Sequence, residues 1–185
     1  MKLPVFITLG SNIEPEKNLI AAAHLLADEA DLDVVGVSRV YRTPAIGLDG
    51  ETNPDQADYL NAAVLIETEL PILILKRDIL RRIEARLERV RTQDKYAPRT
   101  IDLDIAFYGH DVLGLIIEDF EGGKEMLFPD PDVTRYAHSA LPLADLDPTF
   151  VHPLTGERLG KIAERFRGAS DITVEPLKLI DPDDL

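Results

Sequence analysis

The chain has 185 residues, no cysteine and a formal net charge of −14, and its length is typical of one soluble domain. Without cysteine it has no disulfides and no thiolate sites, and its acidic charge argues against broad contact with nucleic acid. No apolar run approaches the roughly 20 residues that cross a bilayer, and the N-terminus does not resemble a secretion signal. We therefore expect a cytoplasmic protein that binds neither membrane nor nucleic acid.

One segment departs from this acidic average. Between Lys76 and Arg99 the chain has nine basic residues and four acidic ones. A compact basic zone in an acidic protein is typical of a site for a small polyanionic ligand. The charged face of a solvated amphipathic helix would give the same pattern, so the charge alone leaves both interpretations open.

The first part of the chain alternates between extended and helical patterns. Residues 5–10, "VFITLG", form a β-branched run that a glycine ends, and they predict a strand. Leucine and alanine at helical spacing, with Pro15 in the first turn, predict a helix over about 15–29. Residues 31–43 alternate in polarity and predict a second strand that ends before Pro44.

The middle of the chain predicts a loop, two strands and a long helix. Residues 44–58 are rich in Pro, Gly, Asp and Asn and predict an exposed loop, which a third strand follows at 59–69. From Pro71 apolar residues recur every three or four positions, which predicts a helix to about residue 90. A fourth strand is predicted at 100–108. The remaining predicted elements are a glycine-rich excursion and two helical pieces, at 115–125, 133–143 and 159–167.

The predicted order through the fourth strand is βαββαβ. This order is typical of an α+β, ferredoxin-like fold, in which two helices cover one face of an antiparallel sheet. No internal repeat or low-complexity linker divides the chain. We predict one domain over 1–185, with a core at 4–153 and a C-terminal extension at 154–185. The fold hosts many functions and does not by itself indicate one.

Two carboxylates lie in the fourth predicted strand. Because residues two apart in a strand point to one face, Asp102 and Asp104 share a face while Leu103 and Ile105 point into the core. Such a pair suits Mg²⁺, which binds carboxylate oxygens; an exposed face with solubilising acids is the alternative. The nearby Arg99 favours the metal site, because guanidinium groups beside metal ligands stabilise a transferring phosphoryl group.

Other motifs are weaker. The turn "LGSN" at 9–12 has a single glycine and is more typical of a strand-to-helix turn than of a phosphate cradle. No serine lies in the G-x-S-x-G setting of a hydrolase nucleophile, and no P-loop is present. The histidines have no spacing typical of a zinc site; they are His24, His110, His138 and His152.

Five segments together resemble the 6-hydroxymethyl-7,8-dihydropterin pyrophosphokinase family of folate biosynthesis. They are "TLGSN", "YRTPAIG", "DYLNAAV", the helix with Glu84 followed by "RVR", and "APRTIDLDIAFYG". The similarity runs from about residue 5 to residue 153. The combination of "PRT-x-D-L-D" with "YRTP" and "YLNAAV" in this order is highly specific, whereas each piece alone is weak.

The resemblance implies a ferredoxin-like fold and transfer of pyrophosphate from ATP to the hydroxymethyl group of the pterin, releasing AMP. Asp102 and Asp104 match positions that bind two Mg²⁺ ions, and Arg89 and Arg99 match catalytic positions that contact phosphates. The other matches on the ATP side are Glu84, Arg91, Ile105 and Asp130. The matches on the pterin side are Thr43, Pro44, Ile46, Tyr59, Asn61, Tyr96 and His138. An aromatic face and an amide that both donates and accepts suit a flat, polar heterocycle.

Several positions depart from the family pattern. Glu88 stands where the family has glycine, and we expect it to extend the preceding helix. Asp130, in "PDP", replaces the histidine of "PHP", where a carboxylate near a triphosphate is unfavourable unless a cation intervenes. Tyr96 lies where a tryptophan is common, and His138 aligns with a second pterin-stacking aromatic unless the alignment slips to Tyr136. Two loops are longer than usual, at 47–57 and 115–125.

These observations leave three hypotheses. The first is an active, monomeric, Mg²⁺-dependent pyrophosphokinase with the small-molecule substrates ATP and hydroxymethyl-dihydropterin. The departures at Glu88 and Asp130 motivate the second, a catalytically weakened paralogue that binds pterin or nucleotide as a sensor or partner module. The third, a ferredoxin-like nucleic-acid-binding module, is disfavoured by the acidic charge and by the lack of an aromatic-rich strand motif.

Overall fold

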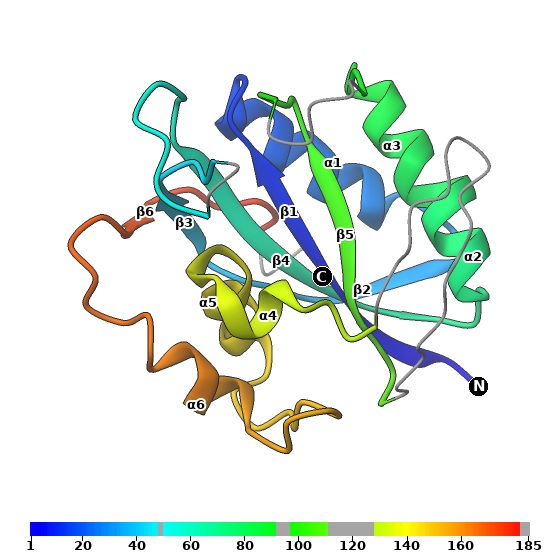
Figure 1. Ribbon diagram of the computed structural model, residues 1–185. Coiled ribbons are helices and arrows are strands. Elements are labelled where there is room, and N and C mark those ends of the chain that lie inside the picture. Colours follow the sequence, from blue (N-terminus) through cyan, green and yellow to red (C-terminus); the bar gives the residue numbers. More distant parts are fainter. Residues whose placement is uncertain (48–49, 92–96, 111–127, 182–185) are drawn as a thin grey trace.

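A computed structural model describes residues 1–47, 50–91, 97–110 and 128–181. Within them, a six-stranded sheet lies between two groups of helices (Figure 1). The strands are β1 (Leu3–Ser11), β2 (Leu32–Val37), β3 (Val40–Thr43), β4 (Tyr59–Thr68), β5 (Asp102–Tyr108) and β6 (Thr173–Glu175). The helices are α1 (Pro15–Ala27), α2 (Ile72–Ile74), the π-helical turn η1 (Leu75–Leu80), α3 (Arg81–Arg86), α4 (Asp132–Arg135), α5 (Ala137–Leu146) and α6 (Leu159–Ala163).

The sheet is antiparallel at each pairing of the described strands. Its order is β5-β1-β4-β3-β6, and β2 also pairs with β4. The interior strand β1 is antiparallel to both β4 and β5, while β2 and β3 pair antiparallel with successive stretches of the central strand β4. The prediction of an α+β protein with an antiparallel sheet is confirmed.

Each face of the sheet has its own apolar core. On β1, Val5 and Ile7 are buried against α1, η1 and α3. The neighbouring Phe6 points to the other face and packs with Phe107 of β5 under α5 and α6. This alternation along one strand is the expected consequence of side chains that point to opposite faces in turn. Within the described residues, no helix is long and apolar enough to cross a membrane.

The predicted second strand is two strands. Ser38 lies between them, and its hydroxyl accepts a hydrogen bond from the Ala63 N–H at 2.8 Å and donates one to the Arg39 carbonyl at 2.7 Å. The side chain thus replaces a strand-to-strand hydrogen bond where the backbone turns. Similarly, the helix expected at 133–143 is divided into α4 and α5 by Tyr136, whose backbone is extended (φ −131°, ψ 140°).

The long helix from Pro71 ends earlier than predicted. Its last turn closes at Arg86, and Glu88 adopts a left-handed backbone with φ of 59°. The Arg89 N–H donates to the Glu84 carbonyl at 3.0 Å and the Glu88 N–H to that of Ala85 at 3.1 Å. This is a Schellman ending, whose left-handed position is usually glycine. The expectation that Glu88 extends the helix is therefore wrong: the glutamate occupies the position that ends it.

The C-terminal part adds one element that periodicity did not indicate. The short strand β6 pairs with β3, Tyr41 lying opposite Val174. The last predicted helix is shorter than expected, since α6 ends at Ala163. The excursion expected at 115–125 lies outside the described residues, as do residues 48 and 49 of the loop at 47–57.

Candidate active site

A pocket of about 530 Å³ opens on the same face of the sheet as Phe6 and Phe107. It lies next to the part of this face that α5 and α6 cover. Its floor is a row of residues from three strands, because Gly10 of β1 lies opposite Asn61 of β4 and Asp102 of β5. The pocket lining consists of Thr8, Leu9, Gly10, Thr43, Pro44, Ile46, Tyr59, Asn61, Arg99, Asp102, Asp104, Asp130, Asp132, Arg135, Tyr136, His138 and Ser139.

Gly10 leaves room for the amide beside it. A Cβ at this position would lie 3.3 Å from the Asn61 Oδ1, which is tighter than ordinary packing. Asn61 is 5% exposed, and its Nδ2 donates to the Thr43 Oγ1 at 3.0 Å. Any larger residue at position 10 would therefore push the amide away from its place in the pocket floor.

Aromatic rings stand on both sides of this floor. Burial raises the pKa of Tyr59, against the opposing effect of Arg99, whose guanidinium lies 5.9 Å from the tyrosine ring centre. Across the pocket, Tyr136 and His138 stack with ring centres 5.2 Å apart and planes 12° apart. Burial lowers the pKa of His138, which favours a neutral imidazole. The structure thus places both residues considered for the second aromatic wall in the pocket lining.

Asp102 lies among arginines. It forms an ion pair with Arg99, and the Nη2 of Arg89 lies 3.9 Å from its Oδ2. Burial lowers the pKa of Arg89, but that of Arg99 is raised because Asp102 and Tyr59 outweigh the effect of burial. The buried Nε of Arg89 has no hydrogen-bond partner among the described residues. A buried guanidinium with an unsatisfied N–H is suited to an added anionic oxygen.

The turn at 9–12 holds the segment that carries Arg99. Asn12 accepts a hydrogen bond from the Arg99 N–H at 2.8 Å and donates its own backbone N–H to the Arg99 carbonyl at 3.1 Å. The Ser11 hydroxyl donates to the Thr100 carbonyl at 2.5 Å. Ser11 and Asn12 are therefore positioning residues that the interpretation as a simple turn missed, since their partners lie some 90 residues away in the sequence.

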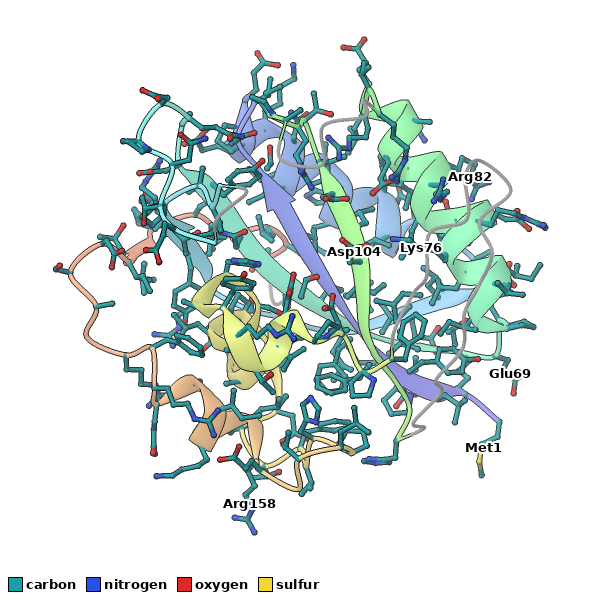
Figure 2. The ribbon with its side chains drawn as sticks, viewed as in Figure 1. Met1, Glu69, Lys76, Arg82, Asp104 and Arg158 are labelled. Carbon is teal, nitrogen blue, oxygen red and sulfur yellow. The ribbon has the colours of Figure 1, made fainter. Side chains whose placement is uncertain are left out.

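Asp104 is paired from the helix side. The Lys76 ammonium lies 2.7 Å from the Asp104 Oδ1 and 2.5 Å from the Leu103 carbonyl oxygen. Burial alone would lower the pKa of Lys76. The negative charges of Asp104, Glu84 and Asp102 outweigh this effect, so the pKa is raised and the side chain is charged. In Figure 2, Lys76 approaches β5 from the side of α3, and Asp104 lies beside it.

Glu84 occupies the same edge of β5. It is 2% exposed, and its Oε1 accepts the Leu103 N–H at 2.9 Å. It also pairs with Arg91. Burial raises the pKa of this carboxyl, and the positive charges of Lys76 and Arg91 oppose that increase. Glu84 and Lys76 therefore bind the backbone N–H and the backbone carbonyl of Leu103, the residue between the two aspartates.

Asp130 lines the pocket beside β5. Its Oδ1 accepts the Asp132 N–H at 2.9 Å, and its own N–H donates to the Ala106 carbonyl at 3.1 Å. Burial raises the pKa of Asp130 to about 7, and the charges of Asp104 and Asp132 contribute in the same direction. This side of the pocket has an excess of negative charge that a bound cation would relieve.

Most of the residues expected in the site line this pocket, and a few do not. Thr43, Pro44 and Ile46 lie in its wall. Ile105 is 2% exposed and packs in the core on the other face of the sheet, so its side chain is not part of the lining. Tyr96 lies outside the described residues. The expected residues beside the pocket but outside its lining are Glu84, Arg89 and Arg91.

The donor set fits Mg²⁺. Mg²⁺ is usually held by one or two carboxylates together with waters and substrate phosphates, rather than by a cage of protein ligands. Asp102 and Asp104 supply two carboxylates on one face of β5, within a pocket that Asp130 also lines. Within the described part of the chain, no group of three or more His, Cys, Asp or Glu residues forms a closed site. Waters or phosphate oxygens would therefore complete the shell of an ion here.

Comparisons with known proteins identify the family of this chain. The family 7,8-dihydro-6-hydroxymethylpterin-pyrophosphokinase (HPPK) matches residues 6–148. The 2-amino-4-hydroxy-6-hydroxymethyldihydropteridine pyrophosphokinase of Synechocystis is 32% identical over 160 residues, which are 86% of this chain and 74% of that protein. The protein of the same name from Methylorubrum extorquens is 36% identical over 149 residues, or 79% of this chain and 84% of that one.

A solved structure shows the same fold. The Plasmodium falciparum HPPK-DHPS A437G protein with pteroate superposes with a TM-score of 0.67 at 12% identity, over 90% of this chain and 43% of that one. This chain therefore spans less than half of that longer protein, and the likeness concerns the fold alone. The family match and the curated relatives carry the assignment: the chain belongs to the 7,8-dihydro-6-hydroxymethylpterin-pyrophosphokinase family and is a pyrophosphokinase.

Proposed function

We propose that this protein transfers pyrophosphate from ATP to the hydroxymethyl group of 6-hydroxymethyl-7,8-dihydropterin with Mg²⁺ as cofactor. The hydroxyl oxygen of the pterin attacks the β-phosphorus of ATP and loses its proton to water. The bond from that phosphorus to the oxygen it shares with the α-phosphate breaks, and AMP leaves with the oxygen. The observation that carries the proposal is one pocket with an amide and aromatic rings at one end and paired carboxylates and arginines at the other.

The pterin end is proposed to hold a flat heterocycle. Tyr59 and the stacked pair of Tyr136 and His138 offer ring faces, and Asn61 offers an amide fixed by Thr43. An amide in a buried place discriminates strongly, because a ligand without matching groups leaves it unpaired. Pro44 and Ile46 would line the edge of the heterocycle.

The phosphate end is proposed to bind ATP. Arg89 and Arg99 would bind phosphate oxygens, with Arg91 and Glu84 beside them, and Asp130 would face the triphosphate as a neutral acid or through a cation. Asp102 and Asp104 would hold two Mg²⁺ ions. Bound Mg²⁺ would neutralise phosphate charge and stabilise the charge that develops during transfer. Fixed guanidinium groups contribute in the same way and need no reorganisation.

The remaining proposals concern the whole chain. We propose that it acts as a monomeric, cytoplasmic, single-domain enzyme on small-molecule substrates. The observed strand order supports a ferredoxin-like core formed by β1, α1, β2 with β3, β4, α3 and β5. Residues 154–185 would then be an extension to this core.

The test is to incubate the purified protein with ATP, Mg²⁺ and the hydroxymethyl-dihydropterin, and to identify the nucleotide product by chromatography. AMP is expected, in equal amount to the pterin pyrophosphate. ADP, or no product, would contradict the proposal, and calorimetric binding of the pterin without AMP would favour the weakened paralogue. Asp102→Ala and Asp104→Ala should each abolish AMP formation, and Asp78→Asn, an exposed carboxylate on η1, should leave it unchanged.

A further inference from the structure

A buried cation lies at the edge of the strand that carries the two aspartates. The Lys76 side chain is 9% exposed, whereas that of its partner Asp104 is 49% exposed. The ammonium therefore approaches the carboxylate from the protein interior, while the carboxylate itself opens to the pocket (Figure 2). Its second contact, at 2.5 Å, is the carbonyl of Leu103, which fixes the ammonium to the backbone of β5.

A structural need alone does not account for this lysine. Lys76 lies in η1 between Leu75 and the core residues Ile79 and Leu80, where an apolar side chain would fill the space. Burying an ammonium costs free energy that its ion pair often does not recover, so an apolar replacement is frequently neutral or stabilising. The π-helical turn is consistent with a functional role, since such turns are frequent at functional sites.

The charge of Lys76 acts on a crowded acidic region. Asp104 shares its pocket with Asp102, Asp130 and Asp132. A fixed positive charge beside Asp104 restrains the orientation of its carboxylate and reduces the attraction of the site for free divalent cations. Both effects follow from the short distance, because Coulomb interactions in a partly buried site are weakly screened.

We propose that Lys76 is a positioning residue for pyrophosphate transfer. Its ammonium holds Asp104 in one orientation on β5 and offsets part of the negative charge of the site before the nucleotide arrives. Divalent cations then bind productively only together with the phosphates of ATP. The inference rests on the proposed function and adds a residue of η1 to the machinery of β5.

The kinetic test compares Lys76→Met with Arg77→Met. Arg77 is the neighbouring cation on η1, and its guanidinium is exposed and paired with Asp78. Loss of the fixed orientation of Asp104 should lower kcat about 10- to 100-fold, because small misplacements of catalytic groups have effects of this size. The KM for the pterin should stay the same, since Lys76 does not line the pocket. Arg77→Met should match the wild type in both constants.

The second readout is binding of Mn²⁺ alone to the nucleotide-free protein, followed by electron paramagnetic resonance. Without the ammonium, Lys76→Met should bind Mn²⁺ about tenfold more tightly, which corresponds to about 1.4 kcal/mol. A residue that only filled space would leave this affinity unchanged. Lys76→Gln removes the charge but keeps a donor for the Leu103 carbonyl, so it serves if Lys76→Met does not fold, and it should also bind Mn²⁺ more tightly.

The outcomes separate the inference from the proposed function. An active wild type with Lys76 variants of unchanged kcat, or of unchanged Mn²⁺ affinity, would overturn the inference and leave the proposed function standing. A wild type that forms no AMP would contradict the proposed function. In the Asp104→Asn background, Lys76→Met should raise the Mn²⁺ affinity less than it does in the wild type, because the ammonium has lost its direct partner and acts only on the more distant Asp102 and Asp130.

Discussion

The two halves of one sheet face have opposite chemistry although the same strands form them. In the half covered by α5 and α6, β1 contributes Phe6 and β5 contributes Phe107, both about 1% exposed. In the open half, the same strands contribute Gly10 and Asp102. The covered half is a packed aromatic core, and the open half is a polar pocket. The two halves differ both in the side chains that the strands supply and in their cover of helices.

This division separates stability from activity along a single strand. Phe107 follows Asp104 by three residues, yet it contacts Phe6 and Phe150, at ring-centre distances of 5.6 and 4.8 Å. The aspartates contact charged groups and the pocket. Substitutions in the covered half should therefore change the free energy of unfolding, and those in the open half should change binding and turnover.

The largest effect is expected for Phe107→Ala. Removing a ring packed against those of Phe6, Phe150 and His152 should lower the free energy of unfolding by about 3 to 5 kcal/mol, measured by urea denaturation. The affinity of the folded variant for the pterin, measured by calorimetry, should stay within about twofold of the wild type if the halves are independent. A large loss of pterin affinity would show that the two halves are coupled.

The next effect is expected for Asn61→Ala in the open half. The amide is buried and fixed by Thr43, so its loss should leave polar atoms of the bound pterin unpaired and weaken pterin binding by about 2 kcal/mol, or about 30-fold. Calorimetric titration with the pterin checks this, and Asn53→Ala, in the loop before β4, is the control. An unchanged dissociation constant would show that the amide does not contact the ligand.

A pH-dependent effect is expected for Asp130→Asn. Burial raises the pKa of Asp130 to about 7, whereas an unfolded Asp loses its proton near about 4. Between these values the folded protein holds a proton that the unfolded chain has lost, so the free energy of unfolding falls as the pH rises. Because solvent screens part of the interaction, we expect a fall of about 2 kcal/mol from pH 4 to 7.

Asparagine does not titrate, so this fall should be missing in Asp130→Asn. Urea denaturation at several pH values gives the difference between the two proteins, in which the contribution of all other groups cancels. Curves that run parallel from pH 4 to 7 would show that Asp130 titrates normally.

The smallest effect is expected for Glu88→Gly, in neither half. The left-handed backbone of Glu88, with φ of 59°, is strained for a residue with a Cβ, and glycine should stabilise the protein by about 1 kcal/mol. Thermal unfolding followed by circular dichroism checks the sign. Glu69→Gly, at the end of β4, should not be stabilising, and a Glu88→Gly protein of lower stability would show that the helix ending does not carry strain.

Much of this arrangement could be predicted from local pattern. The two-residue spacing of Asp102 and Asp104 in the predicted fourth strand put both on one face, as they lie in β5. The resemblance indicated the pterin residues, most of which line one pocket in the structure. Strand periodicity and motif spacing are properties of neighbouring residues, so the sequence could indicate which residues share a face or belong together. The roles of the individual site residues stay predictions.

Long-range contacts were the part that sequence could not supply. In the sequence, Lys76 is one cation among many on a helix, and only the approach of that helix to β5 pairs it with Asp104. Glu88 was predicted to extend a helix because glutamate favours helices, but the Schellman hydrogen bonds outweigh this preference. The strand β6 is three residues long and depends on pairing with β3, more than 130 residues earlier.

Glu84 and Lys76, which bind the backbone of Leu103, also change the exposed edge of the sheet. Among the strands that the structure describes, β5 is the last on its side of the sheet. An edge strand with unpaired peptide groups is a template for a strand from another chain. The Leu103 N–H donates to Glu84, and the Leu103 carbonyl accepts from Lys76. Another strand therefore cannot pair with the backbone at this residue. Two side chains beside the candidate active site thus also protect this point of the strand against pairing with another chain.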